Sequence, residues 1–170
     1  MSARAVIDSL EFAQAQRELQ GALPVSGLMR LRDFLRDPAG NIEFVVKGGS
    51  DAEHRPVLAL SVSGVLHMQC QRCLEQLDYP LRYSTTLRLV HPEEDLNKTV
   101  ADPEAADAVE ASAELDVAEL IEDEILLSLP FSPRHAEGAC DSRIKARSST
   151  AEGGTFSGLA ALKNVLNRKL

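Results

Sequence analysis

Two long stretches of the chain alternate between apolar and polar residues with the period of two that is typical of β-strands. They cover residues 57–70 and, with the clearest alternation in the chain, residues 77–89. Gly64 interrupts the first stretch and predicts a bulge or bend there. A shorter β-rich stretch covers residues 42–46, and a glycine-rich run at 48–51 is expected to end it. The pattern predicts an antiparallel sheet, and it fits a small closed barrel and an open sheet equally well.

Three other segments carry apolar residues at helical spacing. Residues 8–20 are rich in helix-forming residues, and Ser9 is placed to cap them. Residues 27–36 predict a second short helix, with leucines on one side and arginines elsewhere. The strongest signal lies at residues 116–129.

The helix predicted at 116–129 begins with Asp116 and has Glu119 three residues later, an arrangement typical of a capping box. Pro130 is expected to end it. Its predicted buried stripe consists of Val117, Leu120, Ile121 and Ile125, widened by Leu126, Leu127 and Leu129. We therefore predict an α+β fold, in which an antiparallel sheet is covered by this one main helix, with short N-terminal helices and a flexible C-terminal tail.

The remaining segments predict the domain organisation. Residues 1–140 are expected to form a single α+β domain that contains an acidic mobile loop at about 91–112. Residues 141–155 are polar, with serine and glycine pairs, and are expected to form a linker. Residues 156–170 predict a short amphipathic helix with a basic end.

Charge is distributed unevenly along the 170 residues. The net charge is −8, yet residues 134–170 carry seven bases and three acids, so residues 1–133 carry −12. A body this acidic repels a phosphate backbone, whereas the basic tail can contact one. The candidate nucleic-acid or partner contacts are Arg72 and the tail residues Lys163, Arg168 and Lys169.

The cysteines supply the candidate chemistry. Cys70 and Cys73 have the spacing at which a tight turn presents two sulfurs to one metal ion, and the distant His135 and Cys140 can form a second half-site. Together they make a set of three cysteines and one histidine that uses every cysteine in the protein. A gap of 61 residues separates the halves, so only the fold can join them. The alternative is three ordinary thiols without a metal.

Other site chemistry is absent from the sequence. It contains no phosphate-binding glycine loop, no nucleophile elbow and no zinc-protease motif. A redox Cys-x-x-Cys motif usually opens a helix, whereas this one lies between two predicted strands. We therefore predict a protein that is not an enzyme and binds no small-molecule substrate.

Location is predicted from what the chain lacks. No stretch approaches the roughly 20 apolar residues that span a bilayer. The first residues do not have the charge and hydropathy pattern of a signal peptide. The expectation is a cytoplasmic protein that does not enter a membrane.

Several motifs together resemble the YceD family, the bacterial large ribosomal RNA subunit accumulation proteins. They are CQRCL at residues 70–74, the run ELDVAELIEDEILLSLPFSPRH at 114–135, the following Cys140, and the segment 156–163. Some relatives carry additional cysteines in a second cluster after the LP motif, where this chain has only His135 and Cys140. The resemblance covers most of the chain in order and places the family's motif positions on Cys70, Cys73, His135 and Cys140.

The resemblance implies a non-enzymatic factor needed for the synthesis, processing or stability of 23S rRNA in 50S subunit biogenesis. The implied partners are a pre-50S particle, 23S rRNA or ribosomal proteins, and the cofactor would be one structural Zn²⁺. Two alternatives stay open from the residues: a protein-binding adaptor without an RNA role, and a thiol redox protein.

Overall fold

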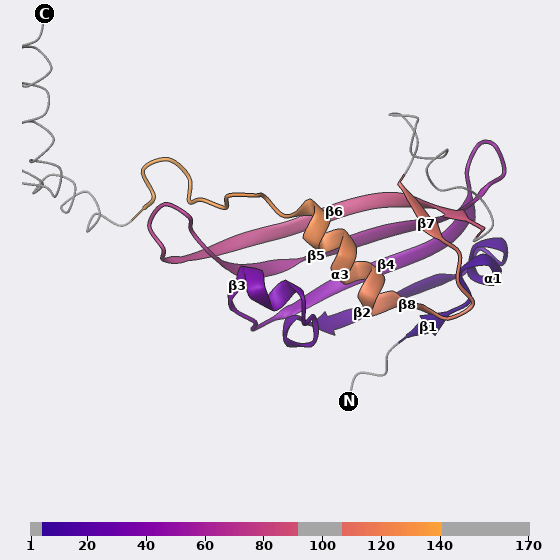
Figure 1. The fold of residues 1–170 in the computed structure, drawn as a ribbon, viewed down its shortest axis with the longest axis horizontal. Coiled ribbons are helices and arrows are strands. Elements are labelled where there is room, and N and C mark those ends of the chain that lie inside the picture. Colours follow the sequence, from indigo (N-terminus) through magenta and orange to yellow (C-terminus); the bar gives the residue numbers. More distant parts are fainter. Residues whose placement is uncertain (1–4, 92–106, 141–170) are drawn as a thin grey trace, which may run out of the picture.

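The structure is a computed structural model that describes residues 5–91 and 107–140 (Figure 1). Its main sheet contains six strands, and β1 and β8 form a separate pair. The main-sheet strands are β2 (Glu18–Pro24), β3 (Leu35–Asp37), β4 (Asn41–Ser50), β5 (Pro56–Gln69), β6 (Gln76–Val90) and β7 (Ala108–Glu110). The other elements are β1 (Val6–Ile7), α1 (Ser9–Gln14), the 3-10 turns η1 (Val25–Gly27) and η2 (Leu31–Phe34), β8 (Leu115–Asp116) and α3 (Val117–Ser128).

The main sheet is open. Its strands follow the order β2-β4-β5-β6-β7, and β3 pairs with the end of β5 that β4 does not reach. All pairs are antiparallel except β6 with β7, which is parallel. Of the two arrangements that the alternation allowed, the closed barrel is therefore wrong.

The core lies between one face of this sheet and α3, which crosses the strands (Figure 1). The predicted strands at 57–70 and 77–89 are confirmed as β5 and β6. The inward residues of β5 are buried, and those of β6 are buried at Leu81, Leu87 and Leu89 and partly buried at the other inward positions. The helix side of the core is supplied by the predicted stripe Val117, Leu120, Ile121 and Ile125. Leu127 does not widen that stripe, because its side chain is 78% exposed.

The main helix begins as predicted, with Asp116 as N-cap. Its carboxylate accepts hydrogen bonds from the backbone N–H groups of Ala118 (2.9 Å) and Glu119 (3.3 Å), which lack partners within the helix. The helix ends at Ser128, and Leu129 before Pro130 is extended.

The predicted N-terminal helices are largely wrong. The first helix spans only Ser9–Gln14, and its N-cap is Asp8 in place of the predicted Ser9. The Ser9 side chain is buried, and its hydroxyl donates to the backbone oxygen of Ser112. Residues 18–24 form the edge strand β2 instead. The second predicted helix is replaced by η1, η2 and β3. In this segment Leu31 packs into the core, and β3 pairs with β5. Pairing with a neighbouring strand outweighed local helix propensity in both places.

Two predictions about strand breaks are also wrong. Residues 48–50 do not end the strand but continue β4 opposite β5. Gly64 forms no bulge, since it pairs in register with Ile42 and Leu81. A Cβ atom at Gly64 would lie 2.7 Å from the Ile42 side chain, so this position needs glycine for close packing. The expected loop at 91–112 includes strand β7 at its end, and residues 92–106 lie outside the described part.

Two carboxylates of α3 are buried at its edges. Glu122 accepts hydrogen bonds from the backbone N–H groups of Arg30 (2.6 Å) and Leu31 (2.9 Å), so it ties the η1–η2 segment to the helix. Glu124 accepts a hydrogen bond from the Tyr83 hydroxyl at 3.1 Å. Burial raises the pKa of Glu124, although that hydrogen bond opposes the shift. Glu122 therefore fixes the η1–η2 segment beside the helix, and Glu124 fixes the helix on strand β6.

The predicted linker at 141–155 and tail helix at 156–170 lie outside the described residues. Within the described part of the chain, no helix is both long and apolar enough to cross a bilayer.

A matched pair of glycines in β4 tests the packing of α1 on the sheet. A Cβ atom at Gly48 would lie 2.3 Å from the backbone oxygen of Phe12, whereas one at Gly49 would meet only Val57 at 3.9 Å. We expect Gly48→Ala to lower the free energy of unfolding by roughly 1–3 kcal/mol through overpacking, measured by urea denaturation. Gly49→Ala is the control and should leave stability unchanged or slightly raised. Equal effects of the two substitutions would contradict this packing.

Candidate metal centre

The first half of the site is the turn between β5 and β6. Their register continues to the pair Gln69–Gln76, so the six residues between them form the tip of a long hairpin. The turn is closed by hydrogen bonds from Cys70 N to Glu75 O (2.9 Å) and from Leu74 N to Cys70 O (2.8 Å). The expected placement of the cysteine pair between two strands is thereby confirmed, and both side chains are buried.

The second half is the segment that follows α3. It runs from the helix back to the hairpin tip, where Gln71 N donates to Pro133 O at 2.8 Å (Figure 1). A turn between Ala136 and Ala139, with Gly138 at a φ of 83°, then reverses the chain and returns Cys140 to His135. The fold therefore closes the gap of 61 residues that the sequence left open.

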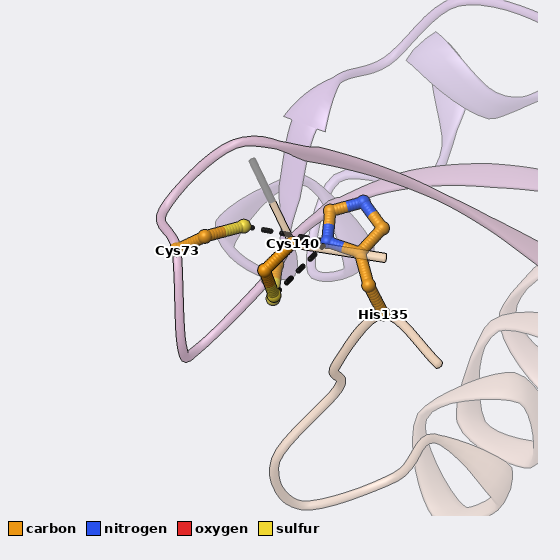
Figure 2. A group of neighbouring side chains, drawn as sticks. Cys73, His135 and Cys140 are labelled. Carbon is orange, nitrogen blue, oxygen red and sulfur yellow. Dashed lines mark hydrogen bonds between the residues drawn. The ribbon is translucent and has the colours of Figure 1, made fainter. Parts of the chain in front are cut away.

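The four predicted ligands meet at this tip. Their candidate ligand atoms all lie within 4.8 Å of one another, so Cys70, Cys73, His135 and Cys140 are able to bind one metal ion. The His135 Nδ1 atom lies 3.3 Å from Cys73 Sγ and 3.8 Å from Cys140 Sγ (Figure 2). The Sγ atoms of Cys70 and Cys140 are 3.9 Å apart.

The three distances of 3.3, 3.8 and 3.9 Å fit the size of a tetrahedral metal site. Metal–ligand bonds of about 2.0–2.3 Å, as zinc forms with nitrogen and sulfur, place ligand atoms about 3.5–3.8 Å apart on the edges of the tetrahedron. The donor set of thiolates and one imidazole suits zinc among the common cations. All four positions are supplied by the protein, which is typical of a structural site and not of a catalytic one.

Neighbouring groups orient the ligands. The His135 Nε2 atom lies 2.9 Å from the Gln76 backbone oxygen, which fixes this nitrogen as the N–H donor and leaves Nδ1 for a metal. Arg72 donates from Nε to Cys140 Sγ at 2.9 Å. Its Nη2 atom donates to the backbone oxygens of His135 (3.3 Å) and Ala136 (3.2 Å). Arg72 therefore links the hairpin to the second segment.

The close packing of the three thiols and the imidazole shifts the pKa values of Cys70, Cys73 and His135. Burial disfavours the Cys70 thiolate, but backbone N–H groups of His135, Cys73 and Arg72 donate to it and lower the pKa of Cys70 to about 5. At Cys73 the backbone N–H of Glu75 favours the thiolate, yet burial and the neighbouring sulfurs raise the pKa. Hydrogen bonds to Cys140 and Cys70 raise the pKa of His135. A divalent cation would displace these protons and relieve the repulsion between thiolates.

Of the four predicted contact residues, the structure describes only Arg72. Arg72 is exposed, but its guanidinium is directed at the cluster, a role that the sequence analysis did not foresee. Lys163, Arg168 and Lys169 lie outside the described residues. The sequence also carried no signal for the backbone oxygen of Gln76 or for Pro133, because backbone groups are the same at every position.

Comparison with known proteins identifies the family of the chain. The family model for "Large ribosomal RNA subunit accumulation protein YceD" matches residues 58–163, which include the hairpin, α3 and all four cluster residues. The match covers more than half of the chain, so the chain belongs to the YceD family. No solved structure matched it.

Removal of the Arg72 guanidinium tests its part in the site. Arg72→Ala keeps all four ligands but loses the link between the two segments, so we expect metal affinity to fall about tenfold. Competition with a chromophoric chelator measures that affinity. Arg134→Ala is the matched control, since Arg134 is exposed and donates to Ser132 without contacting the cluster. Equal affinities in the two variants would show that Arg72 does not support the site.

Proposed function

We propose that this member of the YceD family is a non-enzymatic ribosome biogenesis factor needed for the synthesis, processing or stability of 23S rRNA. The family match across residues 58–163 is the observation that carries the proposal. The site supports a structural role in place of catalysis, because all four candidate ligands come from the protein and leave no open position.

The proposed cofactor is one Zn²⁺ held by Cys70, Cys73, His135 and Cys140. Zinc would supply a fixed tetrahedral link and no redox chemistry. The residues of the chain do the rest: the carbonyl of Gln76 orients His135, and Arg72 balances the negative charge of the sulfurs. The link would hold the tip of the β5–β6 hairpin against the segment after α3, and so stiffen the end of the sheet.

The proposed partners are a pre-50S particle, through 23S rRNA or ribosomal proteins, in the cytoplasm. The net charge of −8 suits contact through basic ribosomal proteins at least as well as direct contact with RNA. Where RNA is touched directly, Lys163, Arg168 and Lys169 are the proposed phosphate contacts, together with the exposed edge of Arg72.

Two other functions have less support. A thiol redox role would need an accessible thiolate, whereas Cys70 and Cys73 are buried and share their surroundings with a histidine at ligand distance. An adaptor without an RNA role would leave the family match unexplained. The tests below separate these alternatives from the proposed function.

Metal content gives the first test. Protein purified without chelator should contain one zinc per chain by elemental analysis. Cys70→Ser and Cys140→Ser should lose the metal and unfold at lower temperature, because each removes one ligand from a different segment. His91→Ala is the control, since His91 is an exposed histidine outside the cluster. Full zinc in both serine variants would contradict the proposed site.

Ribosomal RNA levels give the second test. Cells that lack the protein should contain less 23S than 16S rRNA relative to wild-type cells, measured by quantitative RNA electrophoresis and gradient sedimentation. Wild-type protein and the His91→Ala variant should restore the ratio, and the Cys70→Ser variant should not. An unchanged ratio in cells without the protein would favour the adaptor. Restoration by Cys70→Ser would keep the RNA role and remove the need for the metal.

A further inference from the structure

A groove of about 510 Å³ lies between the N-terminal half of α3 and the segment that joins β2 to β3, and none of the cluster residues lines it. In Figure 1 that segment and α3 lie on the same face of the sheet. Its apolar lining comes from Leu23, Pro24, Leu28 and Met29. Met29 is 64% exposed, although large apolar side chains are costly to leave in water.

The helix side of the groove is acidic. Glu119, Glu122 and Asp123 line it, and Arg30 is the one base among the lining residues. Arg30 forms ion pairs with both Glu122 and Asp123, so a net negative charge remains beside the apolar side. A segment that fits this groove needs an apolar face with lysine or arginine next to it.

The chain itself contains such a segment. Residues 156–170 carry apolar residues at helical spacing, and residues 153–170 include three bases and no acid. Lys163 follows Leu162 directly and lies four residues after Leu159, so a helix would place it beside the apolar face. The family match extends beyond the described domain and ends at Lys163, which includes this segment in the family's matched region.

The connection is long enough. The fifteen residues 141–155 span at most about 50 Å when extended. The tail would have to return along helix α3, which has twelve residues and is about 18 Å long, and along residues 129–135, which span at most about 24 Å. The sum of about 42 Å is within the reach of the connection. A tether of this length raises the effective concentration of the tail at the groove to about the millimolar range, which offsets the weak helix-forming tendency of so short a segment.

We propose that residues 156–170 dock in this groove of their own chain, with Leu159 and Leu162 against the exposed side chains of Pro24 and Met29 and with Lys163 toward Asp123. The evidence for this docking does not depend on the role in ribosome biogenesis. Docking would nevertheless affect that role, because a docked Lys163 faces carboxylates and cannot contact phosphate. A partner that binds the basic tail must therefore displace it from the groove.

Photo-crosslinking in the full-length, metal-loaded protein tests the contact. A benzophenone amino acid at position 162, in place of Leu162, should crosslink within the chain to the groove, chiefly to Met29, as mapped by mass spectrometry. The same amino acid at position 149 in the connection is the control and should give no preference for the groove. Crosslinks between chains that rise with protein concentration would assign the groove to a second copy and overturn the proposal. Crosslinks scattered over the surface would also overturn it.

Limited trypsin digestion supplies a second measurement without a bulky probe. Cleavage after Lys163 should be at least about fivefold slower than cleavage after Arg147, because only the docked segment is protected. Met29→Asp places a charge in the apolar part of the groove and should abolish the protection. Leu127→Asp is the matched control, since Leu127 is equally apolar and exposed on α3 but lies outside the groove. Equal cleavage rates at Lys163 and Arg147 in the wild-type protein would contradict the docking.

Discussion

The long pairing of β5 with β6 is the interaction on which the rest of the structure depends. Residues 57–69 pair without a shift with residues 76–88, and this one hairpin supplies both a part of the core and the first half of the candidate site. One face of the hairpin supplies the apolar surface on which α3 packs. Its tip carries Cys70 and Cys73 away from that core to the end of the sheet. A slip by one residue would turn every inward side chain to the other face and destroy both arrangements.

The segment after α3 completes the candidate site by adding His135 and Cys140 to the two cysteines of the hairpin. The helix must cross the sheet for its buried stripe to meet the core, and its C-terminal end then continues toward the hairpin tip. Backbone contact at Pro133, the turn at Gly138 and the guanidinium of Arg72 hold His135 and Cys140 there. Bringing distant residues together costs chain entropy, and a bound metal would offset that cost by linking the two ends. The candidate centre therefore depends on contacts between two distant segments as well as on the hairpin turn.

The buried acids of α3, Glu122 and Glu124, lie in the middle of the helix, whereas the cluster residues His135 and Cys140 follow its C-terminal end. Glu122 accepts hydrogen bonds from backbone groups of the β2–β3 segment, which fixes this segment beside the helix, and a groove lies between the two. The acidic residues of α3 therefore differ in role. Glu122 holds the β2–β3 segment, whereas Glu119 and Asp123 line the groove in which we propose that the C-terminal tail docks.

The sequence alone determined the elements whose pattern is long and periodic: β5, β6, α3 with its Asp116 cap, and the ligand types and spacing of the cluster. Period and spacing are local properties that a chain carries wherever it folds. It did not determine β2, β3 or the continuation of β4, since residues 18–24 and 48–50 have weak strand signals and are extended because a neighbour pairs with them. Only the tertiary structure decided that the sheet stays open and that the Arg72 guanidinium contacts the cysteine cluster. It also decided that the two half-sites meet, because the separation in space of residues 61 positions apart depends on every element between them.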